Sequence, residues 1–253
     1  MDKRVVWCIT GSGSFLREIY DLFVKLREKH GIVIAVAFSD AGVEVARIYG
    51  ILDQIDKIVS KNTPYSGVYF SRDSASGIPL AGRISFKRYD LVVVAPSTSN
   101  TVAKIVHGIA DTLPTIIVSQ SLKAGIPVII FPSDYSARSL TTLPCRIDLD
   151  KCIYCMKCLL EEGFCPYNAI VASSCKYGIH LSIDYSKCRG CEVCVNKCPV
   201  KAIKCWEKAT ITPSTIDLRN LEKLATINGV TVVTSLKELE KAIYKKLSIN
   251  VKT

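Results

Sequence analysis

The sequence predicts an α/β fold, a parallel sheet with helices on both faces, interrupted late in the chain by a small cysteine-rich segment. Short, nearly continuous apolar runs alternate with amphipathic helical patterns through the first half. Ten of the twelve cysteines lie between Cys145 and Cys198, and the alternation of strand and helix patterns resumes after residue 214. With 253 residues, 49% of them hydrophobic, the chain is long enough to bury the core that such a fold needs.

The first half begins with a strand, a glycine loop and a helix. Residues 4–9 are apolar and β-branched, TGSGS follows at 10–14, and a helical pattern runs from Phe15 to about Lys29. Further strands are predicted at 32–38, 91–94, 115–118 and 128–131, with a helix over 100–109. Because strands buried on both faces form nearly continuous apolar runs, the order predicts a doubly wound, Rossmann-like parallel sheet.

Two polar stretches follow strands of this sheet. GSG at 11–13 offers backbone N–H groups at a helix N-terminus, which suits a phosphate. It lacks the third glycine of G-x-G-x-x-G, since Leu16 stands there, and it has no Lys-Ser/Thr of a P-loop. PSTSNT at 96–101 places small hydroxyl and amide side chains after a later strand. The carboxyl ends of such strands line the ligand crevice, so both stretches are candidate binding loops.

The cysteines form an internal repeat of two runs. The runs are Cys152, Cys155, Cys158 and Cys165-Pro166, then Cys188, Cys191, Cys194 and Cys198-Pro199. They close alike, as CPYNAI and CPVKAI, and the first holds three extra residues before its last cysteine. The second run has the C-x2-C-x2-C-x3-C-P spacing of bacterial ferredoxins, in which the fourth cysteine ligates the other cluster.

This spacing predicts two [4Fe–4S] clusters, because three closely spaced thiolates reach three irons and the fourth iron needs a sulfur from elsewhere. The first cysteine set is Cys152, Cys155, Cys158 and Cys198; the second cysteine set is Cys188, Cys191, Cys194 and Cys165. Zinc held by four thiolates is the alternative, which the duplicated order disfavours. Cys8, Cys145, Cys175 and Cys205 are interpreted as small buried hydrophobic residues, with a functional alternative for Cys145 near the junction.

The binding loops resemble a known family. GSGS at 11–14, Ser39 past the second strand, and PSTSNT followed by VAKIVHGIADTL look like the flavoprotein family that includes the FMN-dependent cysteine decarboxylases. The resemblance implies FMN, bound at a subunit boundary of a trimer. It implies that Gly11, Ser12, Gly13 and Ser39 hold the phosphate, and that Thr98, Asn100, Thr101, Ser119 and Gln120 border the ribityl chain or ring. Helix N-capping is the alternative for Asn100 and Thr101, and a turn hydroxyl for Ser39.

Decarboxylation is not expected. FPSDYSARS stands at 131–139, where the decarboxylases resemble one another in a P-x-M-N-x-x-M segment, and none of the three histidines, His30, His107 and His180, is suitably placed for their active-site histidine. The catalytic residues are therefore unknown. Asp134 and Tyr135 are candidates for an acid because they replace that segment, with a simple turn as the alternative.

Residues 146–206 resemble the two-cluster bacterial-type ferredoxin domain. We expect a flavoprotein domain at 1–145, an inserted small α+β ferredoxin domain at 146–208, and the last strand and helix of the flavoprotein domain at 209–253. Linkers are expected near 141–145 and 209–214. VTVV at 230–233 predicts the last strand, and Ser235 with Glu238 predicts a capping box on the last helix.

The whole arrangement resembles the archaeal iron–sulfur flavoproteins of the dihydromethanopterin reductase (acceptor) family. A flavin passes one or two electrons and each cluster passes one, so the combination gathers single electrons for a hydride transfer. The resemblance implies reduction of 7,8-dihydromethanopterin to tetrahydromethanopterin with a ferredoxin-like donor. The alternative is an electron-transfer flavoprotein that links ferredoxin to another redox partner and has no organic substrate.

Charge and hydropathy limit the classes of partner that we expect for this chain. The formal charge of +10 suits an acidic electron carrier and an anionic substrate, and the favoured alternative is a solvated surface with a basic C-terminal tail. Lysine and arginine are scattered, so nucleic-acid binding is not expected. The start of the chain has no leader pattern and the apolar runs are far shorter than the roughly 20 residues of a membrane span. We therefore expect a cytoplasmic protein without a membrane partner, and in the cytoplasm thiols stay reduced. The family resemblance implies a homotrimer or a multiple of trimers.

Overall fold

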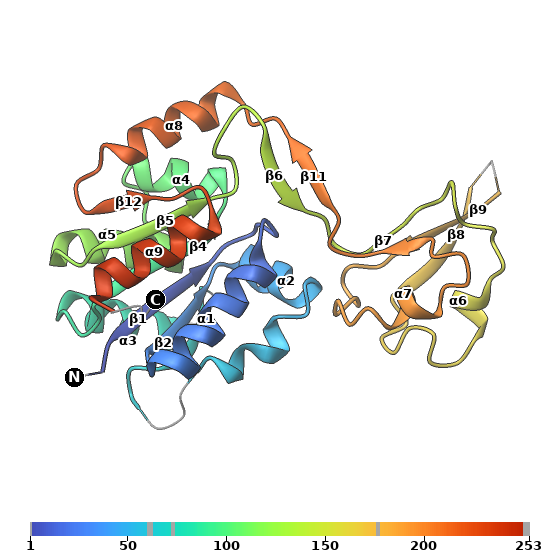
Figure 1. The fold of residues 1–253 in the computed structure, drawn as a ribbon, viewed down its shortest axis with the longest axis horizontal. Coiled ribbons are helices and arrows are strands. Elements are labelled where there is room, and N and C mark those ends of the chain that lie inside the picture. Colours follow the sequence, from blue (N-terminus) through green and yellow to red (C-terminus); the bar gives the residue numbers. More distant parts are fainter. Residues whose placement is uncertain (1, 60–62, 72–73, 176–177, 250–253) are drawn as a thin grey trace.

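The computed structural model describes residues 2–59, 63–71, 74–175 and 178–249, without the side chains of residues 74–77 and 175. The interpretation of Cys175 as a buried residue therefore lies outside the described side chains. A six-stranded sheet forms one part of the molecule, and the cysteine-rich segment extends from it on a two-stranded ribbon (Figure 1).

The central sheet has the strand order β12-β5-β4-β1-β2-β3, and every pairing in it is parallel. Its strands are β1 (Arg4–Ile9), β2 (Val33–Phe38), β3 (Gly67–Phe70), β4 (Leu91–Ser97), β5 (Val128–Pro132) and β12 (Val230–Val232). Strands β2, β4 and β5 are buried along their whole length, which explains their continuous apolar sequences. The predicted doubly wound sheet is confirmed.

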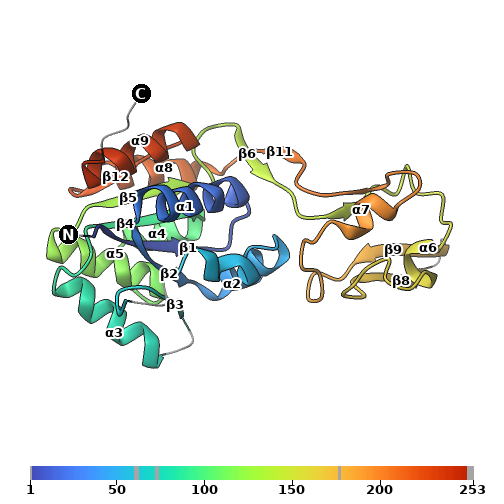
Figure 2. The same ribbon diagram turned by 60° about the horizontal axis from the view of Figure 1, so that its bottom comes forward.

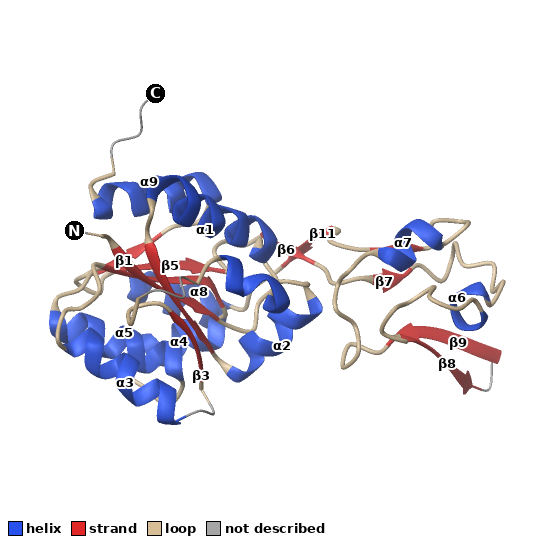
Figure 3. Ribbon diagram, turned by 90° about the horizontal axis from the view of Figure 1, so that it is seen from below, coloured by secondary structure: helices blue, strands red, loops and turns tan. Residues whose placement is uncertain are grey.

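Helices cover both faces of the sheet (Figure 3). One face carries α1 (Leu16–His30), α2 (Asp40–Ile48), the 3-10 helix η1 (Leu52–Lys57) and α9 (Leu236–Leu247). The other carries α3 (Ser74–Ser85), α4 (Ser99–Val106), α5 (Leu113–Ala124) and α8 (Thr215–Ala225). Side chains that point to opposite faces of each strand enter two separate apolar cores, because successive residues of a strand alternate in direction. We call the sheet and these helices the sheet domain.

The strand predicted at 115–118 is wrong, because these residues belong to α5. Thr112 and Thr115 form a capping box at its start, and Pro114 lies in the first turn, where a missing N–H costs nothing. Ile117 and Val118 are buried on the inner side of the helix. A short apolar run has the same appearance in a buried strand and in the buried face of a helix, which is why periodicity failed here.

The last elements agree with the prediction more closely. Strand β12 pairs with β5, and α9 follows it and packs on the face of α1. Ser235 caps α9 by accepting a hydrogen bond from the Glu238 amide. The Glu238 carboxylate accepts from the amide of Thr234, the residue before the N-cap, and the backbone of Ser235 also contributes to lowering the pKa of Glu238.

The cysteine-rich segment holds two small helices, a hairpin and the far half of the ribbon (Figures 1 and 2). Its elements are β7 (Arg146–Ile147), α6 (Lys157–Leu160), β8 (Ile170–Cys175), β9 (Gly178–Ile183), α7 (Val193–Lys197) and β10 (Ile203–Lys204). The predicted linkers overlap β6 (Ser139–Thr142) and β11 (Lys208–Ile211), which pair antiparallel. The segment therefore leaves the sheet domain on paired strands.

A disulfide between Cys145 and Cys205 crosses this ribbon. The pairings β6–β11 and β7–β10 share one register, which places the two cysteines opposite each other between them. Cys145 is buried as expected and Cys205 is half-buried, but the interpretation of both as simple packing residues is wrong, because they are joined to each other. Sixty positions separate them in the chain, so only the pairing of the two ribbon strands reveals their proximity. No helix among the described residues has the length and apolar character that crossing a membrane requires.

Candidate functional site

The sheet has its topological switch point between β1 and β4. From β1 the chain proceeds through β2 and β3 to one side, and β4 then lies on the other side of β1. Ligands of doubly wound sheets bind outside the carboxyl ends of the strands at this point. Thr10 joins the two loops that emerge there, since its Oγ1 donates to Pro96 O (2.9 Å) and accepts from Thr98 N (3.0 Å). Both predicted binding loops therefore lie side by side.

The glycine loop packs tightly on its surroundings. A Cβ atom at Gly11 would lie 2.7 Å from Ala41 Cβ, and one at Gly13 would lie 2.0 Å from the hydroxyl oxygen of Tyr49. Within the loop, Ser12 Oγ accepts from the amide of Ser14 (3.2 Å). Gly13 has no side chain, which leaves room for the Tyr49 ring. Any contact between Gly13 and a ligand is therefore made by the Gly13 backbone.

Ser39 caps the neighbouring helix. Its Oγ accepts a hydrogen bond from Gly42 N (3.0 Å), and Gly42 approaches β1 so closely that a Cβ would lie 2.3 Å from Ile9 O. The first turn of α2 therefore packs against the end of β1, beside the glycine loop. This geometry matches the turn-hydroxyl alternative for Ser39, and it leaves the predicted phosphate contact untested.

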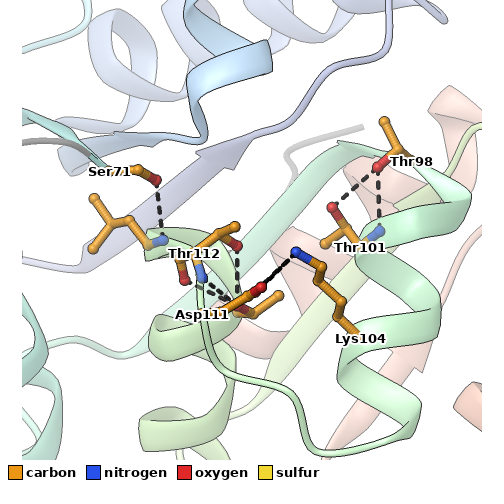
Figure 4. Close-up of polar contacts among 8 residues, drawn as sticks. Ser71, Thr98, Thr101, Lys104, Asp111 and Thr112 are labelled. Atoms are coloured by element: carbon orange, nitrogen blue, oxygen red, sulfur yellow. Dashed lines mark hydrogen bonds and ion pairs between the residues drawn. The ribbon is translucent and has the colours of Figure 1, made fainter.

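The loop after β4 enters α4 through Thr98, which is the N-cap (Figure 4). Thr98 Oγ1 accepts from the amide of Thr101 (3.2 Å), and the two hydroxyls lie 3.0 Å apart. Asn100 is exposed, whereas Thr101 is buried. Thr98 is thus the N-cap, a position that the alternative interpretation gave to Asn100 and Thr101. Just before it, Ser97 Oγ is buried and has no hydrogen-bond partner among the described residues.

An ion pair braces the loop between α4 and α5. Lys104 Nζ lies 2.8 Å from the Asp111 carboxylate, and the amide of Leu113 donates to Ser71 Oγ (3.1 Å) at the end of β3 (Figure 4). The hydrogen bond from Lys104 holds the pKa of Asp111 below its usual value. Through these contacts the HGIADTL stretch connects the carboxyl ends of β3 and β4.

Two predicted flavin contacts lie elsewhere. Ser119 and Gln120 belong to the middle of α5, because the strand expected before them is a helix. Gln120 Oε1 accepts from Ser85 Oγ (3.2 Å) in the last turn of α3. Helix α3 follows β3 and leads back toward the start of β4, so its last turn is at the amino edge of the sheet. Within the chain, these two residues are not brought to the glycine loop.

The loop after β5 completes the carboxyl edge. Ser133 Oγ donates to Asp134 Oδ2 (2.7 Å), and Ser99 Oγ at the start of α4 donates to the same oxygen. Tyr135 is tied into the turn that follows, where its hydroxyl accepts from the amide of Leu140 (3.4 Å). The two hydroxyl donors fix the orientation of the Asp134 side chain, so this carboxylate is a connection between the β4 and β5 loops.

The four cysteines of the first set line one pocket. Cys152, Cys155, Cys158 and Cys198 all line it, together with apolar side chains such as Ile147. Burial raises the pKa of Cys158, and the neighbouring thiols of Cys152, Cys155 and Cys198 raise it further. The structure therefore brings together four sulfurs that the sequence assigned to one set from two separate runs.

The second cysteine set converges in the same way. Burial raises the pKa of Cys194 to about 12, and the thiols of Cys165, Cys191 and Cys188 act in the same direction. Four close thiols resist ionising together without a cation between them, so each set is suited to a positively charged metal group.

Both runs repeat the same backbone conformation. The residues on either side of the middle cysteine are left-handed in each run: Tyr154 and Met156, then Gly190 and Glu192. The fourth cysteines are also equivalent, since Ala169 N donates to Cys165 Sγ and Ala202 N donates to Cys198 Sγ, both at 3.3 Å. Turns of this kind point backbone N–H groups into a concave site, an arrangement that suits sulfur anions.

Sequence reasoning missed two aromatic residues that join these sites. The Tyr49 and Trp206 rings pack with centroids 4.9 Å apart, at the contact between the sheet domain and the cysteine-rich segment. The two residues are 157 positions apart and belong to no motif, so the sequence carries no signal of the contact.

The comparisons with known proteins agree with this geometry. The flavoprotein family model matches residues 1–138, which is more than half of the chain and includes the loops after β1, β2, β4 and β5. The chain belongs to the flavoprotein family. In addition, the 4Fe-4S binding domain model matches residues 181–204 of this flavoprotein, which include the second cysteine run.

Two curated relatives of the flavoprotein bear the same name. Dihydromethanopterin reductase (acceptor) of Methanosarcina mazei is 36% identical over 92% of this chain and 95% of its own length. The protein of that name from Methanocaldococcus jannaschii is 38% identical over 68% of this chain and 69% of its own. The flavoprotein is thus a member of a family of reducing enzymes.

Solved structures show the same fold. DmrB of Burkholderia xenovorans in complex with FMN, described as a cubic protein cage for redox transfer, has a TM-score of 0.61 and 29% identity, and the match covers 98% of this chain and 96% of that one. The FMN-dependent cysteine decarboxylase TvaF has a TM-score of 0.50 at 16% identity over 98% of this chain and 99% of that one, which shows the fold alone.

The residues at the switch point fit an FMN group. Buried hydroxyls gather there at Thr10, Ser12, Ser14, Ser97, Thr101 and Ser133. Buried polar groups are costly unless they are hydrogen-bonded, and Ser97 Oγ has no partner among the described residues. A ligand rich in oxygen atoms, such as the phosphate and ribityl chain of FMN, provides partners for such a surface.

The second cysteine run lies within the match to the 4Fe-4S binding domain model, which favours an iron–sulfur cluster over zinc there. The four sulfurs of the first set line one pocket, an arrangement that suits the corners of a cube.

The histidines are not at the candidate site. The His30 ring contacts Tyr244 at the end of α1, His107 is the C-cap of α4, and His180 lies in the β9 hairpin. The expectation that none replaces the decarboxylase histidine agrees with these positions.

Proposed function

We propose that this flavoprotein reduces 7,8-dihydromethanopterin to tetrahydromethanopterin with electrons from a ferredoxin-like donor. The observation that carries the proposal is the presence, in one chain, of a switch-point site suited to FMN and two gathered sets of four cysteines. A relative named for this activity aligns with 92% of this chain, and a second relative of that name aligns with 68%. The overall reaction consumes two electrons and two protons for each C=N bond that is reduced.

The glycine loop and the loops after β2 and β4 are the proposed FMN site. Gly11, Ser12, Gly13 and Ser39 are proposed to hold the phosphate, and Thr98, Asn100 and Thr101 to border the ribityl chain or ring. Ser119 and Gln120 lie on α5, so any contact they make with a flavin involves FMN held by another copy in the proposed trimer. When bound, FMN exchanges electrons singly or as a hydride, which is the step the pterin requires.

Each cysteine set is proposed to hold one [4Fe–4S] cluster, with Cys198 serving the first set and Cys165 the second. Supporting observations are the four sulfurs around one cavity, the matched N–H···S bonds, and the duplicated left-handed turns. The clusters pass one electron at a time, which matches a one-electron ferredoxin-like carrier.

The net charge of +10 supports acidic partners. A positive protein attracts an acidic electron carrier and a substrate with phosphate and carboxylate groups. No side chain is assigned as the acid that protonates the pterin nitrogen. Asp134 occupies the β5 loop, and its two hydroxyl donors give it a positioning role between loops.

The cofactor content is the first test. Protein purified without oxygen is expected to contain FMN, about eight irons and equal sulfide per chain. Cys155→Ser and Cys191→Ser remove equivalent ligands from the two sets, and each variant is expected to lose about half of the iron. Cys8→Ala, in the core of the sheet, is the matched control and keeps all of it. Zinc without sulfide contradicts the cluster assignment.

The activity is tested by stopped-flow spectroscopy. Photoreduced protein is mixed with 7,8-dihydromethanopterin, and the flavin absorbance is followed. We expect reoxidation to be much faster than in buffer, with tetrahydromethanopterin as the product. Reoxidation at the buffer rate contradicts the reductase proposal and favours the alternative, an electron-transfer flavoprotein with no organic substrate.

A further inference from the structure

The two cysteine sets are not equivalent in their distance from the sheet domain. Helix α6, which follows the first cysteines of the first run, lies farther from the sheet than α7 in both Figure 1 and Figure 2. Among the described residues, no hydrogen bond, ion pair or ring contact joins residues 152–165 to the sheet domain. The loop that holds the first cysteines of the second run, residues 184–192, makes several such contacts.

Two glycines allow backbone to meet backbone at this contact. Gly50, just past α2, approaches the loop so closely that a Cβ would lie 2.9 Å from Arg189 O. A Cβ at Gly190 would lie 2.5 Å from Ile48 O, at the end of α2. Both glycines have positive φ angles, of 70° and 60°, which other residues rarely adopt. Gly190 lies between Cys188 and Cys191, so the second cysteine set is held directly against the sheet domain.

Arginines from two helices fasten this loop. Arg47 of α2 donates to the carbonyl oxygens of Tyr185 (3.1 Å) and Ser186. Arg17 of α1 pairs with Glu192 (3.2 Å), lies over the Trp206 ring (4.6 Å) and donates to Tyr49 O (3.3 Å). These bonds connect the loop to both α1 and α2.

The rings of Trp206 and Tyr49 extend this contact from the loop of the second set to the glycine loop. A Cβ at Gly190 would lie 2.9 Å from Trp206 Cη2, and Trp206 Nε1 donates to Glu192 Oε1 (2.6 Å), next to Cys191. The Trp206 ring packs on the Tyr49 ring, and the Tyr49 hydroxyl lies against the Cα of Gly13 in the glycine loop. This hydroxyl also donates to Thr142 O in the ribbon. Burial raises the pKa of Tyr49, so the phenol keeps its proton.

We propose that the second cysteine set is the one that delivers electrons to the flavin site, and that the Trp206–Tyr49 pair is the contact through which they cross. Packing contacts run without interruption from the loop of the second set, through Trp206 and Tyr49, to the glycine loop. Two one-electron crossings supply the two electrons that one C=N bond requires, and a reduced one-electron carrier replaces them. This inference rests on the proposed function only in requiring both kinds of cofactor to be bound.

The order of the two sets is tested with the matched variants Cys155→Ser and Cys191→Ser. Anaerobic protein with bound FMN, without pterin, is reduced in a pulse by the methyl viologen radical. The absorbances of the clusters and of the flavin are then recorded over time. The phase whose rate does not depend on protein concentration reports electron transfer within one molecule. We expect Cys155→Ser to keep the fast internal phase and Cys191→Ser to lose it. The reverse result, or equal rates in the two variants, overturns the order.

A fluorescence measurement checks proximity without FMN or turnover. The chain has two tryptophans, and Trp7 is buried in the sheet core with no exposed surface. Because Trp206 contacts the loop of the second set, a cluster in that set is expected to quench Trp206 emission. Quenching is thus strong in Cys155→Ser and weak in Cys191→Ser. Equal quenching in both variants contradicts the assignment.

The aromatic pair is tested by Trp206→Leu and Trp206→Phe. Loss of the ring is expected to slow the internal phase by about ten- to a hundredfold, because a small misplacement of coupled groups has large kinetic effects. Phe keeps a ring but loses the bond to Glu192, so it is expected to remain near the wild-type rate. Equal slowing in both variants indicates that Trp206 acts only by fastening Glu192, and an unchanged rate in Trp206→Leu rejects the crossing.

Two controls distinguish loss of the Trp206–Tyr49 contact from other causes of a slower rate. The midpoint potentials of clusters and flavin are measured in Trp206→Leu and are expected to be unchanged, since a shifted potential would alter the rate without any change in the contact. No pterin is present in these experiments. A protein that fails to reduce dihydromethanopterin therefore still confirms or overturns the proposed crossing.

Discussion

Cys145 and Cys205 form a disulfide at the midpoint of the ribbon that joins the cysteine-rich segment to the sheet domain. Tyr185 Oη donates to Cys145 O (2.9 Å), so the bond is also connected to the loop of the second cysteine set. The disulfide links the two ends of the segment between Cys145 and Cys205, and this segment contains both predicted cluster sites. It therefore holds together the two ribbon strands that connect the segment to the sheet domain.

Removal of this disulfide is expected to destabilise the segment. Cross-linking of residues so far apart restricts the unfolded chain, and we expect Cys145→Ser/Cys205→Ser to lower the free energy of unfolding by about 2–4 kcal/mol. Urea denaturation of anaerobic holoprotein measures the change. A reducing agent is expected to have the same effect on the wild type and none on the double variant. If the reducing agent also destabilises the double variant, it acts at a site other than this disulfide, such as the clusters.

The Gly13–Tyr49 contact predicts a steric cost. In Gly13→Ala the new methyl group would lie 2.0 Å from the Tyr49 hydroxyl, and overpacking of this kind costs about 1–3 kcal/mol. Gly82→Ala is the control, because no atom lies within 4 Å of its added Cβ and a helical glycine-to-alanine change stabilises by about 0.5–1 kcal/mol. Thermal unfolding compares the two. Equal effects at both positions contradict the tight contact.

Thr98 has a capping role that can be separated from a flavin role. Loss of its N-cap bond in Thr98→Ala is expected to cost about 0.5–2 kcal/mol in protein without FMN. If Thr98 also contacts FMN, the stabilisation gained on adding FMN falls as well, because a ligand stabilises only through its affinity for the folded state. Thr98→Ser keeps the hydroxyl and serves as the control. An unchanged FMN effect in Thr98→Ala assigns the residue to capping alone.

The Lys104–Asp111 ion pair predicts a pH dependence. Its hydrogen bond holds the folded pKa of Asp111 below the ordinary value, so the pair stabilises the fold above the unfolded pKa of the carboxyl group. This contribution is lost as the pH falls through the lowered folded pKa. Asp111→Asn is therefore expected to reduce the melting temperature slightly at neutral pH, because the pair is at the surface. The difference from the wild type disappears in acid, and a difference that grows in acid contradicts this sign.

Much of the sheet domain was predictable because its signals are local. The runs at 4–9, 32–38 and 128–131 are strands within a residue or two of the predicted bounds, since burial on both faces requires continuous apolar sequence. The error at 115–118 arose where the same composition suits a buried helix. Ser119 and Gln120 were expected at the carboxyl edge only because they would have followed that strand, and in α5 they do not lie there.

The cysteine spacing likewise determined by itself which sulfurs belong together, because duplicated short loops impose the same geometry on each run. The disulfide, the side of the segment that meets the sheet domain and the Trp206–Tyr49 contact were decided only by tertiary structure. These contacts join residues 60 to 157 positions apart. They depend on the register of the ribbon and on two glycines that let backbones touch, and neither leaves a periodic pattern in the sequence.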